Sequence, residues 1–378
     1  MEGLARSGGA HASVIFTPLA PRELREPSLL IGYPSLVVDE VSAKRPSAAL
    51  LRGEQPKGLL RIPAAARQDT SMAGLASAAL SEVMVVGELP VYSIIAAYWR
   101  MLDRGKKGSF VGLEEQQAKT LSMEGKVAGD LTLKLFYWFE KPVVDELVET
   151  MNPFLPGLTC RPEEARRFLE EDPRVREGLT EPVKAMKQEK VAVLAEKLYK
   201  LLTSESRAAR KPSELIGYAY YTESMPLRDL REAAYALQAL AELKGLNHVY
   251  AAAATPVQAG AAARIAYRAS RQNTCSAIYS MHAARPQPRQ EGRVKYIVVG
   301  RGDEWPILGV VQQQLALLGD IQEGVVAAME HDDGLLVLLE SLLENYGYSW
   351  LREAIEKKCV TPIEDKPLAS LDPGRCRL

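Results

Sequence analysis

Two acidic residues, Asp39 and Glu40, directly follow the apolar run at 36–38 in the stretch "LVVDEVSAK". An apolar run of this kind predicts a buried strand, and open α/β sheets bind ligands and metals at the carboxyl ends of their strands. The two carboxylates could therefore hold a metal ion, form a salt bridge or lie in a solvated loop. The rest of the chain must decide among these alternatives.

A hydrolytic metal site would need more ligands than these. Two-metal phosphoesterases gather His and Asp ligands around ions about 3.5–4 Å apart. The four histidines are scattered along the chain: His11, His248, His282 and His331. Asp39, Glu40, Asp69 and Asp103 show no paired spacing such as D-x-D. The residues themselves therefore argue against a dinuclear site.

The other catalytic motifs are missing from the sequence. It contains neither a G-x-S-x-G elbow nor a G-x-x-x-x-G-K-[ST] phosphate loop. Gly300 and Gly302 match the first two glycines of the dinucleotide-binding motif G-x-G-x-x-G. Trp305 stands at the position of the third glycine, where close helix packing leaves no room for a side chain, so the match fails. We interpret this stretch as a glycine turn. No nucleophile with a recognisable partner can be named, so the sequence indicates binding rather than catalysis.

Composition describes an ordinary globular protein. A length of 378 residues favours two domains, and a net charge of -1 gives no overall field that would attract nucleic acid. No apolar run is long enough to span a membrane, and the first 16 residues are too short and polar for a signal sequence. The chain has four cysteines and no C-x-x-C pair: Cys160, Cys275, Cys359 and Cys376. This sparse set predicts free thiols in a reducing cytoplasm.

The first third of the chain alternates short apolar runs with helical stretches, which predicts a mainly parallel α/β layer. Strands are expected at 13–16, 28–33, 35–40 and 59–62, and helices at 71–86 and 90–103. Further on, Pro162 and Pro182 each favour the start of a helix. The second of these helices carries an apolar stripe, and its length suits a spine between two domains.

A second domain is expected from about Pro212 onward. Its predicted elements are an extended run at 213–223, helices at 226–244, 256–284 and 306–318, and strands at 248–254 and 294–300. The stretch 320–356 is acidic and leads into an amphipathic helix.

One local patch of positive charge lies on the predicted helix 256–284. Arg264, Arg268 and Arg271 recur at helical spacing, and further basic residues follow at Arg285, Arg289, Arg293 and Lys295. The patch could be a solvated face balanced by the acidic segment after it. It could instead contact single-stranded nucleic acid, with Tyr267 or Tyr279 available to stack on bases.

Several of these stretches, taken together from about 36 to 320, resemble archaeal RecJ-like proteins of the DHH phosphoesterase superfamily. "LVVDE" looks like the family strand that ends in D-H-H, and "TSMAGLASAAL" is similar to the helix start that follows it. "LIGYAYYTESMPLRDLREAAYALQALAELKG" looks like the start of the DHH-associated domain. The resemblance implies an α/β fold with a shortened parallel-sheet DHH-type domain at 1–160, a helical connector at 161–211 and a DHH-associated α/β domain at 212–378.

The departures from the family pattern bear on activity. Asp39 is the only residue of D-H-H that persists, because Glu40 and Val41 stand in place of the two histidines. The family's D-A-D-G and G-G-G-H motifs have no counterpart. Without these ligands a site holds Mn²⁺ poorly. We therefore expect no catalytic residue, metal or cofactor, with Asp39 as the remnant of the family metal motif.

The family includes the GINS-associated nuclease and the eukaryotic replication factor that joins MCM and GINS. The resemblance thus implies an inactive, cytoplasmic and nucleoid-associated replication protein that binds GINS, supports the MCM helicase and touches single-stranded DNA through Arg264, Arg268 and Arg271. One alternative is a residual Mn²⁺-dependent single-strand exonuclease that uses Asp39, Asp69 and Asp103. The other is a stand-alone single-strand binding module.

Overall fold

The computed structural model describes residues 89–378 except 177–178, 255, 302–304, 332–333 and 377–378, together with short pieces before residue 89. Packing divides the chain into two units. The first comprises 1–102 and 111–123, and the second comprises 103–110 and 124–378. The domain boundaries expected at 160 and 211 stay a prediction.

The first unit contains short parallel strands. Three of them form a sheet in the order β2-β4-β5, and two more form a separate pair. The bounds are β1 (Glu23–Leu24), β2 (Leu29–Pro34), β3 (Ser42–Ala43), β4 (Ala48–Arg52) and β5 (Leu60–Arg61), with helices α4 (Leu89–Trp99) and α5 (Gly112–Met123). The strands predicted at 28–33 and 59–62 are confirmed as β2 and β5, and both belong to a parallel sheet. Asp39, Asp69 and the strands expected at 13–16 and 35–40 lie outside the described residues.

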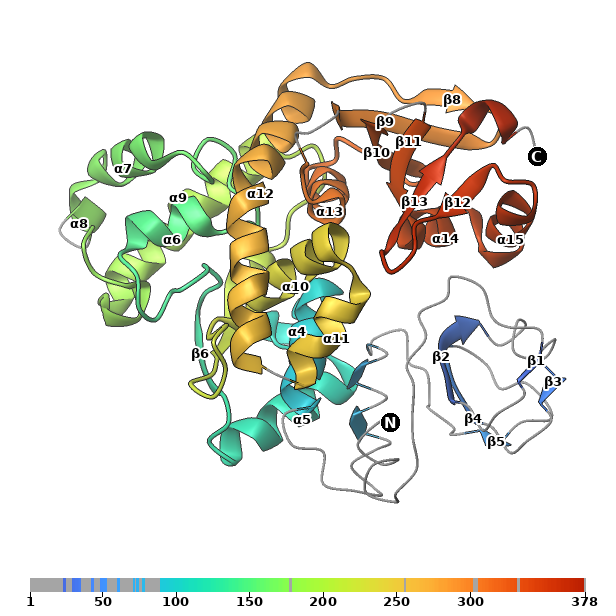
Figure 1. The fold of residues 1–378 in the computed structure, drawn as a ribbon. Helices are drawn as coiled ribbons and strands as arrows, with labels where there is room; N and C mark the ends of the chain where they lie inside the picture. Colours follow the sequence, from blue (N-terminus) through green and yellow to red (C-terminus); the bar gives the residue numbers. More distant parts are fainter. Residues whose placement is uncertain are drawn as a thin grey trace. The chain divides into compact units, whose positions relative to one another are not determined.

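The second unit contains a mixed six-stranded sheet in the order β12-β13-β11-β10-β9-β8 (Figure 1). Only β9 and β10 pair in parallel. The bounds are β8 (Arg289–Glu291), β9 (Val294–Arg301), β10 (Val325–His331), β11 (Gly334–Leu338), β12 (Val360–Pro362) and β13 (Leu368–Leu371). The strand predicted at 294–300 is confirmed as β9. The acidic stretch after residue 320 holds β10 and β11 as well as helices α14 (Leu339–Tyr346) and α15 (Tyr348–Glu356).

The second unit also contains eight further α-helices among its described residues. Their bounds are α6 (Val143–Glu149), α7 (Pro162–Glu170), α8 (Pro173–Arg176), α9 (Gln188–Glu205), α10 (Leu230–Lys244), α11 (Leu246–Ala254), α12 (Pro256–Ala284) and α13 (Leu308–Leu318). The helices predicted at Pro162, 226–244, 256–284 and 306–318 are confirmed. The α/β fold class that the resemblance implied is likewise confirmed.

Two local predictions are wrong. The segment 248–254 was expected as a strand but belongs to α11. Its four alanines favour a helix and lack the branched side chains that fill a pleated sheet. Pro182 does not begin the long helix, since it precedes a short 3₁₀ turn at 183–185, and α9 starts only at Gln188. There Val183 N–H donates to the buried Glu146 carboxylate at 2.9 Å, which holds the turn in place.

All four cysteines are paired, which overturns the expectation of free thiols. Cys160 bonds to Cys275 across 115 sequence positions, and Cys359 bonds to Cys376 across 17. Their Cα atoms lie 6.4 and 5.2 Å apart, within the range that a cystine requires. Sequence spacing could not reveal these pairs because distant elements bring the cysteines together. Paired cysteines of this kind are not a sign of a reducing cytoplasm.

No described helix has the length and apolar character that would let it cross a membrane.

The second unit also contains an antiparallel ribbon of β6 (Ala128–Leu133) and β7 (Ile216–Tyr221). Directly after β6 lies Lys134, whose side chain is fully buried. Its ammonium donates to Asp103 Oδ2 at 2.8 Å, to the Asp103 carbonyl and to the Ser213 carbonyl at 3.0 Å. The guanidinium of Arg231, on α10, donates to the carbonyls of Lys134 and Asn152. Five chain segments therefore meet at one buried charge cluster.

Burial and the neighbouring charges shift the pKa values of Asp103 and Lys134 in opposite directions. Burial would raise the pKa of Asp103, but the nearby Lys134 and Arg231 charges outweigh it and hold the pKa below its ordinary value. Burial lowers the pKa of Lys134 to about 8, although Asp103 partly offsets the effect. Lys134 therefore depends on Asp103 to stay charged inside the protein.

We expect Lys134→Ala to lower the free energy of unfolding by about 3–5 kcal/mol, because it leaves the Asp103 carboxylate buried without its main partner. Urea denaturation followed by circular dichroism measures the loss. Lys200→Ala is the matched control, since that ammonium pairs with Glu196 on the exposed face of α9, and it should leave stability nearly unchanged. Equal effects of the two substitutions would contradict the structural role of Lys134.

A second buried carboxylate, Glu242 on α10, caps the start of α13. It accepts hydrogen bonds from the N–H groups of Leu308 at 2.7 Å and Gly309 at 2.9 Å, and from the Gln238 amide at 2.7 Å. Burial raises its pKa to about 7, which outweighs the effect of these donors. A carboxyl with a raised pKa binds more protons in the folded chain than in the unfolded chain.

Stability should therefore fall as the pH rises from about 4.5, the ordinary value, through about 7. Glu242→Gln should flatten this pH profile of the free energy of unfolding. Part of the pH dependence that remains in this variant comes from Glu232, because burial also raises the pKa of that carboxyl to about 7. Urea melts at several pH values measure the effect, and Glu353→Gln, at an exposed glutamate, should keep the parent profile. An unchanged profile in Glu242→Gln would refute the assignment.

Candidate nucleic-acid interface

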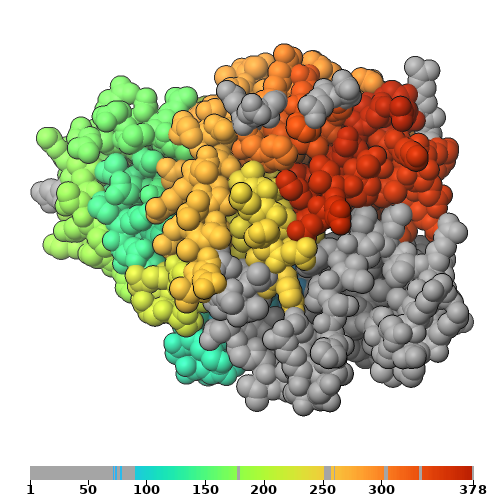
Figure 2. Space-filling view, in the orientation of Figure 1, coloured from blue at the N-terminus to red at the C-terminus, as the bar shows by residue number. Residues whose placement is uncertain are grey.

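The predicted contacts Arg264, Arg268 and Arg271 lie on α12, which packs against α10, α11 and α13. Figure 2 shows α12 in gold and orange on the face in view, between the green α7–α9 region and the red C-terminal segments. Residues three and four positions apart share one side of a helix. Arg264 and Arg271 are nevertheless half-buried, whereas Arg268 is exposed.

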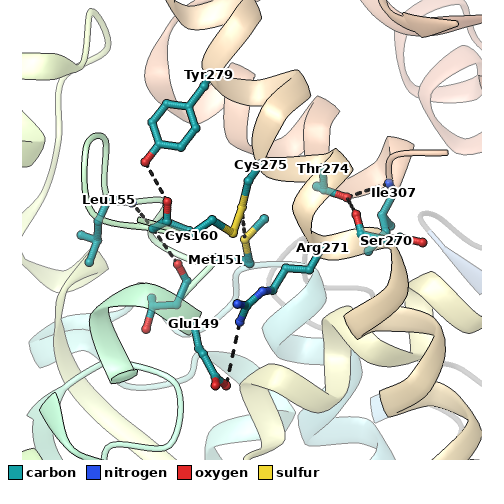
Figure 3. The surroundings of a disulfide bond; sticks show 12 residues. Glu149, Met151, Leu155, Cys160, Ser270, Arg271, Thr274, Cys275, Tyr279 and Ile307 are labelled. Atoms are coloured by element: carbon teal, nitrogen blue, oxygen red, sulfur yellow. Dashed lines mark hydrogen bonds and ion pairs between the residues drawn. A yellow bond between two sulfur atoms is a disulfide. The ribbon is translucent and has the colours of Figure 1, made fainter. Parts of the chain in front are cut away.

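Protein groups already engage two of the three arginines. Arg264 Nη2 donates to the Pro226 carbonyl at 2.5 Å. Arg271 Nη1 lies 4.0 Å from Glu149 Oε2, a contact drawn in Figure 3. Glu149 also accepts from Lys141 at 2.6 Å. These pairings direct the two guanidinium groups toward the protein.

Arg268 makes no hydrogen bond or ion pair with any described residue. On the same helix, the apolar side chains of Val257 and Ile265 are 71% and 69% exposed. Arg268 is thus the arginine of this face whose charge remains available to a phosphate. The assignment of all three as nucleic-acid contacts stays a prediction.

The stacking role proposed for Tyr267 is wrong. Its side chain is only 2% exposed, because it faces the interior side of α12, and no base could reach its ring. Tyr279 is half-buried, and its hydroxyl donates to the Thr159 carbonyl at 2.8 Å. The Arg161 guanidinium lies 4.0 Å from the Tyr279 ring centroid, so it occupies one face of the ring. Neither tyrosine offers an open face of the kind that single-strand binding proteins use.

Basic side chains continue beyond the end of α12 into the β8–β9 hairpin. Arg285, Arg289, Arg293 and Lys295 are all exposed. Arg289 Nη1 lies 3.6 Å from the Glu330 carboxylate, a surface pair of the kind that contributes little to stability. The hairpin therefore extends the positive surface that the sequence indicated.

Asp103 cannot serve the metal site of the exonuclease alternative in this structure. Its side chain is only 4% exposed, and its carboxylate is bound to Lys134, so a metal ion would have to displace the lysine ammonium. Its two proposed partners, Asp39 and Asp69, lie outside the described residues. Within the part of the chain that is described, no three His, Cys, Asp or Glu side chains are placed to hold a metal.

No protein-family model matches the sequence, and neither does any curated protein. A solved structure with a similar fold is the crystal structure of CDC45 from Entamoeba histolytica. The similarity covers 86% of this chain and 72% of that protein, with a TM-score of 0.50 and 10% sequence identity. At this identity the likeness concerns the fold. The chain is an α/β protein, and its fold is of the CDC45 type.

Sequence reasoning missed the buried charge cluster and the disulfide bonds. A signal for the cluster was present, because Lys134 is the lone charge within the apolar run "LTLKLFYWF". A lysine at such a position is buried, and buried lysines need a partner. No comparable signal pointed to Asp103 as that partner, which lies 31 positions earlier. The cystine pairs had no local signal.

The nucleic-acid hypothesis predicts that Arg268→Ala weakens binding to labelled single-stranded DNA and lowers the salt slope of the binding constant by about 0.7. Arg268 is exposed, so its loss should not affect the melting temperature. Fluorescence anisotropy at several salt concentrations measures both quantities. Arg166→Ala, at an exposed arginine on α7, is the matched control. Equal affinities of the parent and Arg268→Ala would exclude this face from the contact.

Proposed function

We propose that this protein is a non-catalytic component of a replicative helicase assembly, which binds GINS and supports the MCM helicase. The observation that carries the proposal is the CDC45-type fold, which extends over 86% of the chain. The resemblance of the sequence to the RecJ-like family supports the same role independently, because it rests on the order of motifs rather than on the coordinates.

Loss of catalysis is supported by two features. Glu40 and Val41 replace the two histidines of the family motif, and neither a second histidine nor a D-x-D pair compensates. Asp103, the third carboxylate of the exonuclease alternative, is bound to Lys134. Single-strand binding fits the proposal as a secondary property, carried by Arg268 and the basic hairpin β8–β9.

The decisive experiment is a pull-down with the full-length protein as bait and the purified GINS complex of the same organism as prey. We expect retention of GINS and, when MCM is added, faster unwinding of a forked DNA substrate than with MCM alone. Lys134→Ala, which disturbs the fold of the second unit, should weaken both. Failure of the parent protein to retain GINS would overturn the proposal.

A nuclease assay distinguishes this proposal from the exonuclease alternative. The protein is incubated with labelled single-stranded DNA and Mn²⁺, beside Asp39→Ala. Intact DNA in both reactions agrees with the proposal. Degradation that disappears in Asp39→Ala would establish the exonuclease instead, whereas degradation that persists in the variant would point to a contaminant.

A further inference from the structure

The Cys160–Cys275 disulfide bond lies at a surface pocket of about 250 Å³. Both cysteines contribute to its wall, together with polar side chains from α12 and from the start of α7: Arg161, Gln272, Ser276 and Tyr279. A pocket of this size can hold a molecule of a few non-hydrogen atoms beside the sulfur atoms. The disulfide bond is therefore open to a small reagent.

The two cysteine residues differ in exposure. Cys160 is half-buried, whereas Cys275 is 1% exposed. The Sγ atom of Cys275 lies 3.7 Å from Met151 Sδ, a contact drawn in Figure 3. A nucleophile that enters the pocket meets Cys160 first. The other disulfide provides an internal comparison, because Cys359 and Cys376 are 1% and 0% exposed.

The pocket also has a directed positive charge. The Arg161 guanidinium is held 4.0 Å from the Tyr279 ring centroid and forms no ion pair with any described residue. On α7, Glu164 is paired with Arg167 at 3.7 Å. Gln272 and Ser276 are neutral and can donate or accept hydrogen bonds. This lining suits a small molecule that carries one carboxylate.

We propose that Cys160 is a site of reversible S-thiolation by a low-molecular-weight thiol that carries a carboxylate, and that Arg161 binds this carboxylate. The thiolate attacks Cys160 Sγ and forms a new S–S bond. The bond to Cys275 breaks, and its electron pair leaves on Cys275 Sγ, which takes up a proton from solvent. A second thiolate then attacks the mixed disulfide and releases Cys160, so that two thiols are oxidised as one cystine is reduced.

The exchange changes how α12 is held. In the disulfide form, a bond across 115 positions ties the middle of α12 to the chain just before α7. After the exchange, the Tyr279–Thr159 hydrogen bond remains as a non-covalent link at this place. The proposal thus assigns a modification site on the helix that also carries Arg268, and it is independent of the role in the helicase.

The test compares two thiols on the full chain at pH 8, the anionic thioglycolate and the neutral 2-mercaptoethanol. Each rate is divided by the rate of the same thiol with bis(2-hydroxyethyl) disulfide, which removes differences in nucleophilicity. Samples are quenched with acid, and mass spectrometry with peptide mapping locates the adduct. We expect the adduct on Cys160, with a relative rate about fivefold higher for thioglycolate, as one nearby positive charge would give.

Arg161→Gln should abolish this preference and leave the rate of 2-mercaptoethanol unchanged. Arg166→Gln, at an exposed arginine outside the pocket, should retain the preference. For the parent protein, 1 M NaCl should remove the preference by screening, so the outcome does not depend on the folding of a variant. Faster modification of Cys359 or Cys376, equal relative rates for the two thiols, or a preference that survives Arg161→Gln would each overturn the proposal.

Discussion

The second unit depends on the buried ion pair between Lys134 and Asp103. Removing two charges from water is costly, and their mutual attraction repays the cost only when every donor finds an acceptor. Lys134 meets this condition, because its three ammonium hydrogens correspond to three acceptors: the Asp103 carboxylate, the Asp103 carbonyl and the Ser213 carbonyl. The pair thereby fixes the end of β6 against two loops that lie far away in sequence.

Arg231 extends this constraint into the helices. Its guanidinium binds the carbonyl oxygens of Lys134 and Asn152, so the first turn of α10 cannot shift without breaking buried hydrogen bonds. Asp229 caps the same turn by accepting from the N–H groups of Arg231 and Glu232, and it also accepts from Tyr137 N–H. The position of α10 in turn sets the position of α12, which packs against it and carries the arginine face.

The same packing explains why only one of the three arginines on α12 is exposed. Arg264 and Arg271 lie at the edges of the contact between α12 and its neighbours. Arg264 donates to the Pro226 carbonyl there, and Arg271 pairs with the Glu149 carboxylate. Arg268 lies between them on the exposed side. Helical spacing places the three arginines on one side of the helix. It does not predict how much of that side the neighbouring helices bury, so it cannot distinguish the three residues.

The sequence by itself determined the α/β class, the parallel pairing early in the chain and the bounds of α12 and β9. These features follow from local periodicity and from proline and glycine punctuation, which act over a few residues. It did not determine which of Cys160, Cys275, Cys359 and Cys376 are paired, which acid neutralises Lys134, or that Tyr267 faces inward. Only the tertiary structure decided these points, because each depends on contacts between segments tens of positions apart, and short-range pattern carries no information about such contacts.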